Sequence, residues 1–361
     1  MNITKLFRPE IKKIKPYISS PTIDDIAKEI GVSKEKIIKA DSGENPYVPD
    51  FGRLGEIKSP KVCYYPDPSC RKLRNKLSEY LKVSEEKITC GNGSDELIDL
   101  LIRIFVSKND EIIINPPTFS MYKFYGELVG ANIKEVLRNK NSLRVDIEKM
   151  LMNISDRTKM VFIDSPGNPT STLIDKGEIE RLLRRQAIVV VDEAYYEYCG
   201  KSAISLLLKY PNLVILRTFS KWAGLAGLRI GYAVACPLII NTIDSIRPPY
   251  NVNSFAQEAA SSVLDNKELY LNRLKKIISL REKCVSYLSS FSDLFVYPSR
   301  GAYILIKPKT NAKTLQTYLR KEGILVKLIK SCFLENTLRM NLPGPSEMKR
   351  IISVLEKYYE N

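Results

Sequence analysis

The chain has 361 residues, of which 44% are hydrophobic and 27% charged, and this length suggests two or more domains with a substantial core. It contains no histidine, which excludes Ser-His-Asp and Cys-His catalysis and histidine-ligated metals. Lys and Arg number 56 against 41 Asp and Glu, which gives a formal net charge of +15.

The positive charge is compatible with a nucleic-acid-binding protein or with attraction for anionic substrates. The lysines are scattered and form no known nucleic-acid-binding motif, so we expect a solvated surface and no nucleic-acid partner. The seven cysteines form no CxxC pair, which disfavours a disulfide framework or a zinc site. No run approaches the roughly 20 apolar residues of a membrane span, and the N-terminus lacks an apolar signal-peptide core. We therefore expect a cytoplasmic protein with no metal and no membrane partner.

In chain order, the pattern first predicts alternating strands and helices. Helices are expected over residues 22–30, from 91–96 through 106, and over 120–129, with strands over 87–90 and 111–115. Continuous apolar runs at 159–164 and 187–192 are typical of parallel strands buried on both faces, and 214–217 and 229–235 add two more strands. This alternation predicts an α/β fold that binds ligands at the carboxyl ends of its strands.

The last third of the chain predicts a smaller α/β domain. A long helical pattern from 255 to 290 precedes expected strands at 294–296, 302–306, 324–328 and 337–341 and a closing helix over 347–359. We therefore divide the chain into an N-terminal arm with part of the small domain (1–42), a large domain (43–260) and a small C-terminal domain (261–361).

Lys221 follows an apolar strand-like run and lies among hydroxyls and glycines. A lysine in a partly apolar pocket can lose its proton and attack an aldehyde to form a Schiff base. The hydroxyls of Thr218 and Ser220 and the guanidinium of Arg229 are donors that a phosphate group binds. An aldehyde site beside a phosphate site is what pyridoxal 5'-phosphate (PLP) requires, although a Ser-Lys pair alone is more often a solvated loop lysine.

Three polar residues follow buried strands. Asp192 ends an apolar strand, where a pyridinium N–H⁺ would stabilise its buried carboxylate; the alternative is an Asp that caps the next helix. Tyr195, three residues later, can reach the ring oxygen of the cofactor. Asn168 can donate its amide to the same oxygen, or simply form an Asn-Pro turn.

Three further positions complete the pattern. Ser94-Asp95 stands at a helix start, which is either an anion site or an ordinary N-cap. Phe119 can lie flat against a heteroaromatic ring or be a plain core aromatic. Arg339 can bind a carboxylate with two hydrogen bonds or form a surface ion pair. The order of these residues along one α/β pattern favours a PLP site built around Lys221.

These motifs resemble fold-type I PLP-dependent aminotransferases, and most closely the histidinol-phosphate aminotransferases. The matching segments span nearly the whole chain: Pro16-Tyr17, Glu44-Asn-Pro-Tyr47, Tyr65-Pro-Asp-Pro68, 91–96, Pro117-Thr-Phe-Ser-Met-Tyr122, Asn168-Pro-Thr170, Asp192-Glu-Ala-Tyr195, 219–232, Pro249-Tyr-Asn-Val-Asn253 and Leu338-Arg339. The resemblance implies a large PLP-binding domain with a mostly parallel sheet between helices, a smaller α/β C-terminal domain, and a homodimer with a shared active site.

The resemblance also implies a role for each site residue. Lys221 binds the cofactor aldehyde and moves a proton between the substrate and the cofactor, Asp192 holds the pyridine nitrogen, and Asn168 and Tyr195 hold the ring oxygen. Phe119 stacks on the ring. The cofactor phosphate is held by Ser94, Asp95, Thr218, Ser220 and Arg229, and by Tyr65 of the neighbouring subunit. The substrate residues are Tyr17, Asn45, Lys327 and Arg339, of which Arg339 binds an α-carboxylate.

Three positions depart from the family pattern. Gly43 stands where Asn is usual, Ser171 where Gly is usual, and Lys327 near the place of an arginine that faces the substrate phosphate. A lysine holds phosphate as a point charge, without the planar fork of an arginine. The transaminase chemistry is independent of these three positions, whereas the choice of substrate depends on them.

The resemblance implies amino transfer between L-histidinol phosphate and 2-oxoglutarate, which gives imidazole acetol phosphate and L-glutamate in histidine biosynthesis. The alternatives are an aromatic or broad-specificity aminotransferase and a PLP enzyme like threonine-phosphate decarboxylase. A nucleic-acid-binding protein that keeps an inactive enzyme fold is a further alternative. Loss of Lys221 or Asp192 would have favoured it, and both residues are present.

Overall fold

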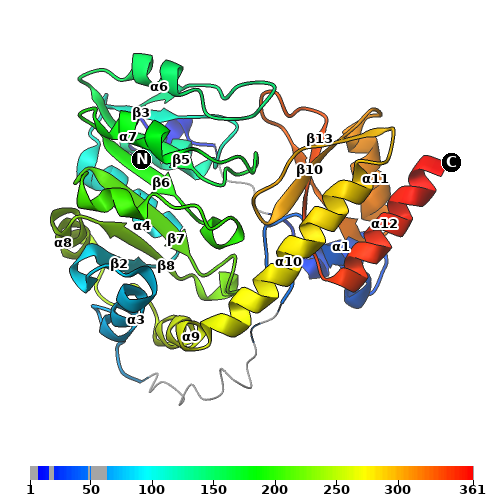
Figure 1. Ribbon diagram of the computed structural model, residues 1–361, viewed down its shortest axis with the longest axis horizontal. Helices are drawn as coiled ribbons and strands as arrows, with labels where there is room; N and C mark the ends of the chain where they lie inside the picture. The colour runs from blue at the N-terminus through cyan, green and yellow to red at the C-terminus, as the bar shows by residue number, and fades with distance from the viewer. Residues whose placement is uncertain (1–6, 16–19, 48, 50–62, 361) are drawn as a thin grey trace, which may run out of the picture.

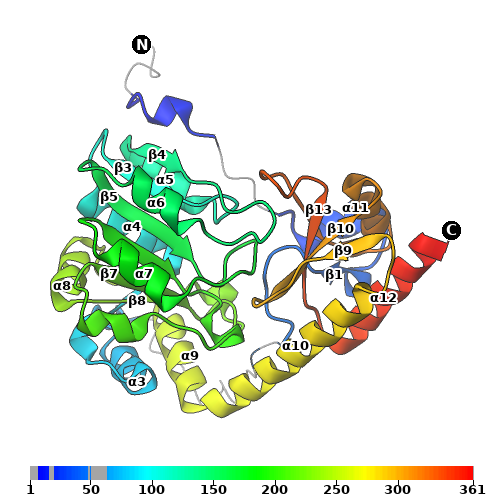
Figure 2. The same cartoon turned by 45° about the horizontal axis from the view of Figure 1, so that its top comes forward.

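The computed structural model describes residues 7–15, 20–47, 49 and 63–360, and these form two domains that lie side by side (Figure 1). A seven-stranded sheet with its helices forms the large domain, and a four-stranded sheet with its helices forms the small domain. The long helix α10 (Lys267–Leu288) runs from the edge of the large domain along the small domain (Figure 2).

The large sheet has the strand order β2-β8-β7-β6-β5-β3-β4. The strands are β2 (Ile88–Gly91), β3 (Glu111–Ile114), β4 (Asn132–Glu135), β5 (Thr158–Asp164), β6 (Ile188–Asp192), β7 (Leu213–Thr218) and β8 (Gly231–Ala235). Only β8 runs antiparallel to its neighbours within this sheet. The sheet is therefore mostly parallel, as predicted.

Helices cover both faces of the large sheet (Figure 1). They are α3 (Arg71–Leu81), α4 (Ser94–Phe105), α5 (Met121–Val129), α6 (Ile147–Asn153), α7 (Lys176–Leu183), α8 (Pro237–Ile246) and α9 (Ser254–Asp265). In β5, Met160 and Phe162 belong to the apolar cluster on one face, while Val161 and Ile163 belong to the cluster on the other. Both faces of the strand are buried, which is why its sequence is a continuous apolar run.

The small domain is built on an antiparallel sheet with the strand order β12-β13-β10-β9. Its elements are β9 (Leu294–Val296), β10 (Tyr303–Pro308), β11 (Ile324–Leu325), β12 (Lys327–Ile329), β13 (Thr337–Asn341), α11 (Ala312–Lys321) and α12 (Pro345–Glu360). From the N-terminal segment, β1 (Ile38–Lys39) pairs in parallel with β11, and α1 (Ile23–Ile30) lies beside this pair. The domain boundaries at residues 42 and 260 stay a prediction.

Two of the predicted elements are wrong, and several elements were not predicted. The helix expected from 255 to 290 is two helices, because Asn266 leaves the helical conformation (φ −106°, ψ 25°) between α9 and α10. The strand expected over 324–328 is two short strands in different sheets, which separate at Val326. Strands β1 and β4 and helices α3, α6, α7, α8 and α11 were not anticipated.

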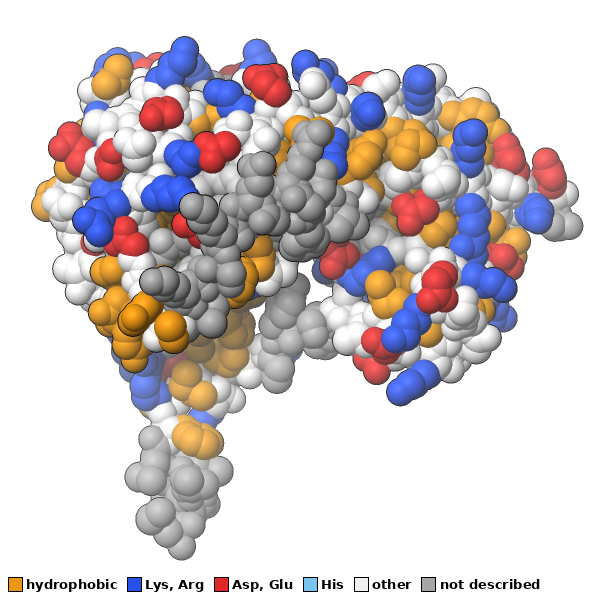
Figure 3. Space-filling view, turned by 90° about the horizontal axis from the view of Figure 1, so that it is seen from below, with side chains coloured by type: hydrophobic (Ala, Val, Ile, Leu, Met, Phe, Trp, Pro, Cys, Tyr) orange, Lys and Arg blue, Asp and Glu red, His pale blue; other side chains and the backbone are white. Residues whose placement is uncertain are grey.

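In the part of the chain that the structure describes, no helix is both long enough and apolar enough to span a membrane. Figure 3, which views the molecule from below Figure 1, shows Lys and Arg side chains interspersed with Asp and Glu over that face. The positive charge there is spread over the surface and does not form one continuous patch.

Candidate active site

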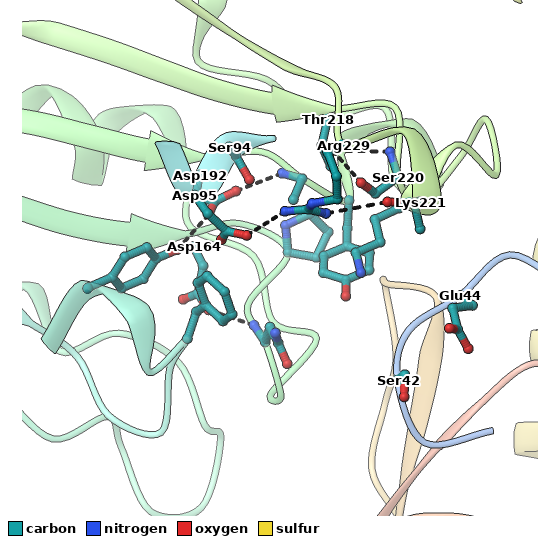
Figure 4. Close-up of a pocket in the computed structure, with 17 residues that line it drawn as sticks. Ser42, Glu44, Ser94, Asp95, Asp164, Asp192, Thr218, Ser220, Lys221 and Arg229 are labelled. Carbon is teal, nitrogen blue, oxygen red and sulfur yellow. Dashed lines mark hydrogen bonds and ion pairs between the residues drawn. The ribbon is translucent and has the colours of Figure 1, made fainter. Parts of the chain in front are cut away.

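A cavity of about 240 Å³ lies at the carboxyl ends of β5, β6 and β7. Figure 4 shows its lining side chains, with Ser42 and Glu44 reaching it from the N-terminal segment. The lining includes most of the predicted cofactor residues: Ser94, Asp95, Phe119, Asn168, Asp192, Tyr195, Thr218, Ser220, Lys221 and Arg229. Residues from distant parts of the sequence thus meet where parallel strands end.

Lys221 is held through its main chain. Its carbonyl oxygen accepts hydrogen bonds from the Asn45 side-chain amide (2.8 Å) and the Tyr198 hydroxyl (3.3 Å). Its ammonium nitrogen lies 5.8 Å from the centre of the Tyr195 ring. Gly43 has φ 81°, and a Cβ added there would lie 3.1 Å from the Lys221 nitrogen and 3.3 Å from the Tyr195 hydroxyl. A glycine at this position therefore leaves space beside the amine.

Asp192 ends β6 and is 6% exposed. Its carboxylate accepts hydrogen bonds from the Tyr122 hydroxyl (2.7 Å) and the Ala194 backbone N–H (2.9 Å). Burial raises the pKa of the carboxyl to about 6, against the opposing effect of these two hydrogen bonds. None of the ion pairs between described residues includes Asp192, so its carboxylate has no cationic counterpart in the part of the chain that the structure describes.

Hydroxyls and a guanidinium gather at the other end of the cavity. The Thr218 hydroxyl donates to the Ser220 hydroxyl (2.9 Å), and the Ser220 backbone N–H donates to the Thr218 hydroxyl (3.1 Å). Arg229, whose φ of 53° is in the left-handed region, pairs with Asp95 of α4 at 2.8 Å. These donors surround the N-terminus of a 12-residue helix, where backbone N–H groups and the helix dipole favour an anion.

Two glycines allow the helix start and the Arg229 side chain to pack closely against the neighbouring backbone at this end of the cavity. A Cβ at Gly231 of β8 would lie 2.6 Å from the Ser94 nitrogen, and a Cβ at Gly93 would lie 2.7 Å from an Arg229 nitrogen. Cβ atoms in proteins essentially never approach other atoms this closely, so a larger residue at either position would displace the helix start or the guanidinium.

The loop after β5 places Asn168 between the two domains. The Asn168 N–H donates to Asp164 (2.6 Å), and its side-chain oxygen accepts from Arg339 of β13 (2.8 Å). Arg339 also donates to the Asp41 carbonyl (2.7 Å). Asp164 is buried and forms an ion pair with buried Arg138; burial raises the pKa of Asp164, and Arg138 opposes this rise.

A second cavity of about 750 Å³ adjoins the first. It shares Ser42, Glu44, Phe119, Asn168, Tyr195 and Lys221 with the smaller cavity. Its other lining residues include the cations Lys39, Lys327, Lys330 and Arg339. Lys327 of β12 is directly opposite Arg339 of β13. The Lys327 side chain is exposed because it borders an open cavity, yet partial desolvation and then Arg339 lower the pKa of its ammonium.

Two predicted residues that the structure describes, Asn45 and Tyr65, do not line either cavity. Asn45 uses its amide to bind the carbonyls of Lys221 and Trp222 and to accept from Tyr47, so it positions the main chain after β7. Tyr65 is 80% exposed and stacks on Tyr250, with ring centres 4.5 Å apart. Tyr17 lies outside the described residues.

The sequence matches the family model for aminotransferase class I and II over residues 40–355. The histidinol-phosphate aminotransferase of Dehalococcoides mccartyi is 40% identical over 356 residues, which cover 98% of each protein. This chain belongs to the aminotransferase class I and II family. A second member, the histidinol-phosphate aminotransferase of Methanocaldococcus jannaschii, is 35% identical over 97% of this chain and 96% of that protein.

Solved structures show the same fold as this aminotransferase. That of histidinol-phosphate aminotransferase from Sinorhizobium meliloti, in complex with PLP, superimposes with a TM-score of 0.85 at 22% identity, over 95% of this chain and 94% of that one. Aspartate aminotransferase from Thermotoga maritima gives 0.83 at 20% identity, over 98% and 100%. The predicted fold class, the transaminase class and PLP as the cofactor are therefore confirmed.

The cavity of this aminotransferase fits PLP. A protonated pyridine nitrogen would provide the cation that buried Asp192 lacks. The Thr218–Ser220 hydroxyls and Arg229, at the start of α4, provide the donor set that a phosphate dianion requires. Lys221 lies in the same cavity, so an aldehyde and a phosphate can be held together.

Two of the three departures from the family pattern have local structural explanations. Gly43 adopts a positive φ beside Lys221. In the orientation of the Asn341 side-chain amide that satisfies its hydrogen bonds, the amide oxygen accepts from the Gly43 and Glu44 N–H groups. Ser171 has φ 57°, a conformation in which glycine is less strained, and its hydroxyl binds a loop of the small domain.

Sequence reasoning missed three buried residues that support the site. Tyr122 binds Asp192, and the Arg138–Asp164 ion pair holds the loop that carries Asn168. Tyr122 belongs to a segment already matched to the family, so its position was available as a signal. Arg138 follows the unanticipated strand β4 and gave no such signal.

Proposed function

We propose that this aminotransferase exchanges an amino group between L-histidinol phosphate and 2-oxoglutarate, and so acts in histidine biosynthesis. The assignment of this substrate rests on one observation. Lys327 lies directly opposite Arg339 on the wall of the larger cavity. Like charges opposite one another on neighbouring strands repel. A phosphate or carboxylate bound between them relieves that repulsion, and the names of the two close relatives support the same substrate.

The cavity residues act on the two ends of the bound cofactor. The bound cofactor would supply an electron sink for the substrate Cα, and the Asp192 carboxylate would keep the ring nitrogen protonated. Because the side-chain oxygen of Asn168 accepts from Arg339, the Asn168 NH₂ group would donate to the ring oxygen, together with the Tyr195 hydroxyl. Phe119, on the cavity wall, would pack against the ring.

Lys221 is the nucleophile and the proton carrier. Its amine would hold the cofactor at the aldehyde carbon, and as a free amine it would be placed to take or return a proton at the substrate Cα. Thr218, Ser220 and Arg229 would hold the phosphate together with the helix start at Ser94 and Asp95, which would fix the cofactor relative to Lys221. Lys327 and Arg339 then hold the anionic groups of the two substrates in turn.

The active protein is a cytoplasmic homodimer in this proposal. Tyr65 lies outside both cavities of its own chain and is exposed, which suits a residue that reaches the phosphate end of the site in the partner subunit. Tyr17 of the N-terminal arm closes over the substrate. The substrates are small molecules, and no nucleic acid is required.

The absorbance spectrum of the PLP-loaded protein tests the proposal. Histidinol phosphate should shift the yellow band, 2-oxoglutarate should restore it, and Lys221→Ala should abolish turnover. A loaded protein that ignores histidinol phosphate but responds to phenylalanine or tyrosine would move the substrate to the aromatic class. Release of CO₂ from threonine phosphate would instead indicate the decarboxylase alternative.

A further inference from the structure

Ser171 joins the large domain to the small domain through its side chain. It follows Asn168-Pro-Thr170 in the loop after β5 and is 2% exposed. Its hydroxyl oxygen accepts hydrogen bonds from the backbone N–H groups of Arg300 (2.8 Å) and Gly301 (2.6 Å) in the loop before β10. It also lies 3.0 Å from the hydroxyl of Ser299. The glycine in a family member would make none of these contacts.

The neighbouring groups fix the direction of each hydrogen bond. The Ser171 oxygen has two lone pairs, and both are used by the Arg300 and Gly301 N–H groups. Its hydrogen must therefore point to Ser299. The Ser299 hydrogen in turn points to the Tyr303 carbonyl at 2.5 Å. All donors and acceptors of the Ser171 hydroxyl are satisfied, and all its partners belong to the small domain.

A second contact ties the same two loops together. The Tyr303 hydroxyl donates to the Gly167 carbonyl, which also accepts from the Ser171 N–H (2.6 Å). The Tyr303 ring lies 5.3 Å from the Arg339 guanidinium and makes an edge contact with the Tyr195 ring at 5.3 Å. The loops that Ser171 connects are therefore in contact with the residues that hold the substrate anion and the cofactor ring.

We propose that the Ser171 hydroxyl is an interdomain clasp, a positioning residue that holds Arg339 of the small domain in register with Asn168 of the large domain. Without the hydroxyl, two buried or partly buried N–H groups lose their acceptor, and the Ser299–Gly301 loop can move away. The Arg339–Asn168 hydrogen bond (2.8 Å) is then one of fewer contacts that hold the two domains in their relative positions. The inference rests on the proposed function only where it assigns Arg339 to the substrate anion.

Two variants separate the hydroxyl from the backbone conformation. Ser171→Gly removes the hydroxyl and relieves the positive φ, whereas Ser171→Ala removes the hydroxyl and keeps the φ preference of an L-residue. Ser261→Ala is the matched control, because Ser261 is equally buried and donates only within its own helix, to the Gln257 carbonyl at 2.7 Å. A purely structural role would lower thermal stability in all three variants without a local effect at the active site.

Hydrogen exchange and steady-state kinetics on the PLP-loaded protein test the clasp. Both Ser171 variants should speed amide exchange at Arg300 and Gly301 and raise the KM for 2-oxoglutarate about tenfold, with kcat changed less, while Ser261→Ala changes neither. Unchanged exchange at Arg300 and Gly301, or an unchanged KM for 2-oxoglutarate, in both variants would overturn the inference. Exchange does not depend on the substrate, so it tests the hydrogen bonds of Ser171 even if histidinol phosphate proves not to be the amino donor.

Discussion

Asp192 is a carboxylate that folding buries without a cationic partner among the described ion pairs. Its pKa rises to about 6 from an ordinary value of 3.8. Between these two pH values the folded chain keeps a proton that the unfolded chain has lost, so the free energy of unfolding falls as the pH rises. Above pH 6 the full cost remains, at most about 3 kcal/mol for a shift of this size. Asp192 therefore destabilises the cofactor-free protein at neutral pH.

Asp192→Asn should separate stability from activity. In the cofactor-free protein the variant should melt at a higher temperature than the wild type at pH 7.5, because it removes a buried charge. Near pH 4, where Asp192 is protonated in the folded chain, that advantage should disappear. PLP-dependent turnover at pH 7.5 should fall by at least a hundredfold, because the ring nitrogen loses its charge partner. A cofactor-free variant less stable than the wild type at pH 7.5 would contradict this account of Asp192.

At the scale of single elements, β12 and β13 bring two cations together. Lys327 and Arg339 are directly opposite in an antiparallel pair, and the Lys327 pKa is already lowered by desolvation and by Arg339. A bound phosphate would raise that pKa again, because an anion favours the charged form of the amine. Phosphate binding should therefore weaken as the pH rises through the lowered pKa of the free enzyme.

Lys327→Ala should raise the KM for histidinol phosphate about tenfold and leave the KM for unphosphorylated histidinol within about twofold. Lys330→Ala is the matched control, because Lys330 lines the same cavity but lies outside the residues of β12 that pair with β13. The measurement is steady-state kinetics with both amines on all three proteins. Equal effects on the two amines would place phosphate recognition elsewhere in the cavity.

Helices and strands were predictable from the sequence where their burial determines the order of apolar and polar residues. Strands β5 and β6 are covered on both faces, so a continuous apolar run identified them and placed Asp192 at a strand end. Strand β4 is at the sheet edge, and its residues are exposed or half-buried, so it has no such run. The break at Asn266 between α9 and α10 was also hidden, because the helical pattern continues on both sides of it.

Contacts between distant parts of the chain were not predictable in the same way. The residues around Lys221 were found because each stands in a recognisable motif at the end of a predicted element. The Arg138–Asp164 pair, the Ser171–Ser299 contact and the Lys327–Arg339 register depend on how the loops and the two domains pack. One sequence without its fold does not contain that distance information.

At the scale of the whole molecule, both domains line the site, and Tyr65 lies outside it. The large domain supplies the strand ends, and the small domain supplies Arg339 and Lys327. Tyr65 and Tyr250 stack beside a groove that also contains Phe255, and all three side chains are exposed. Exposed aromatic side chains gathered in this way are typical of a protein–protein interface. The proposed homodimer would cover them and bring Tyr65 to the partner's site.

Mixed dimers test this arrangement directly. A dimer of one Tyr65→Ala subunit and one Lys221→Ala subunit has both defects in one site and neither in the other, if Tyr65 acts across the interface. Such dimers, purified through a different tag on each subunit, should show about half the wild-type activity, well above either parent homodimer. If Tyr65 acts within its own chain, both sites stay defective and no activity returns. The matched control pairs Lys221→Ala with a subunit carrying both substitutions, which leaves no intact site under either arrangement.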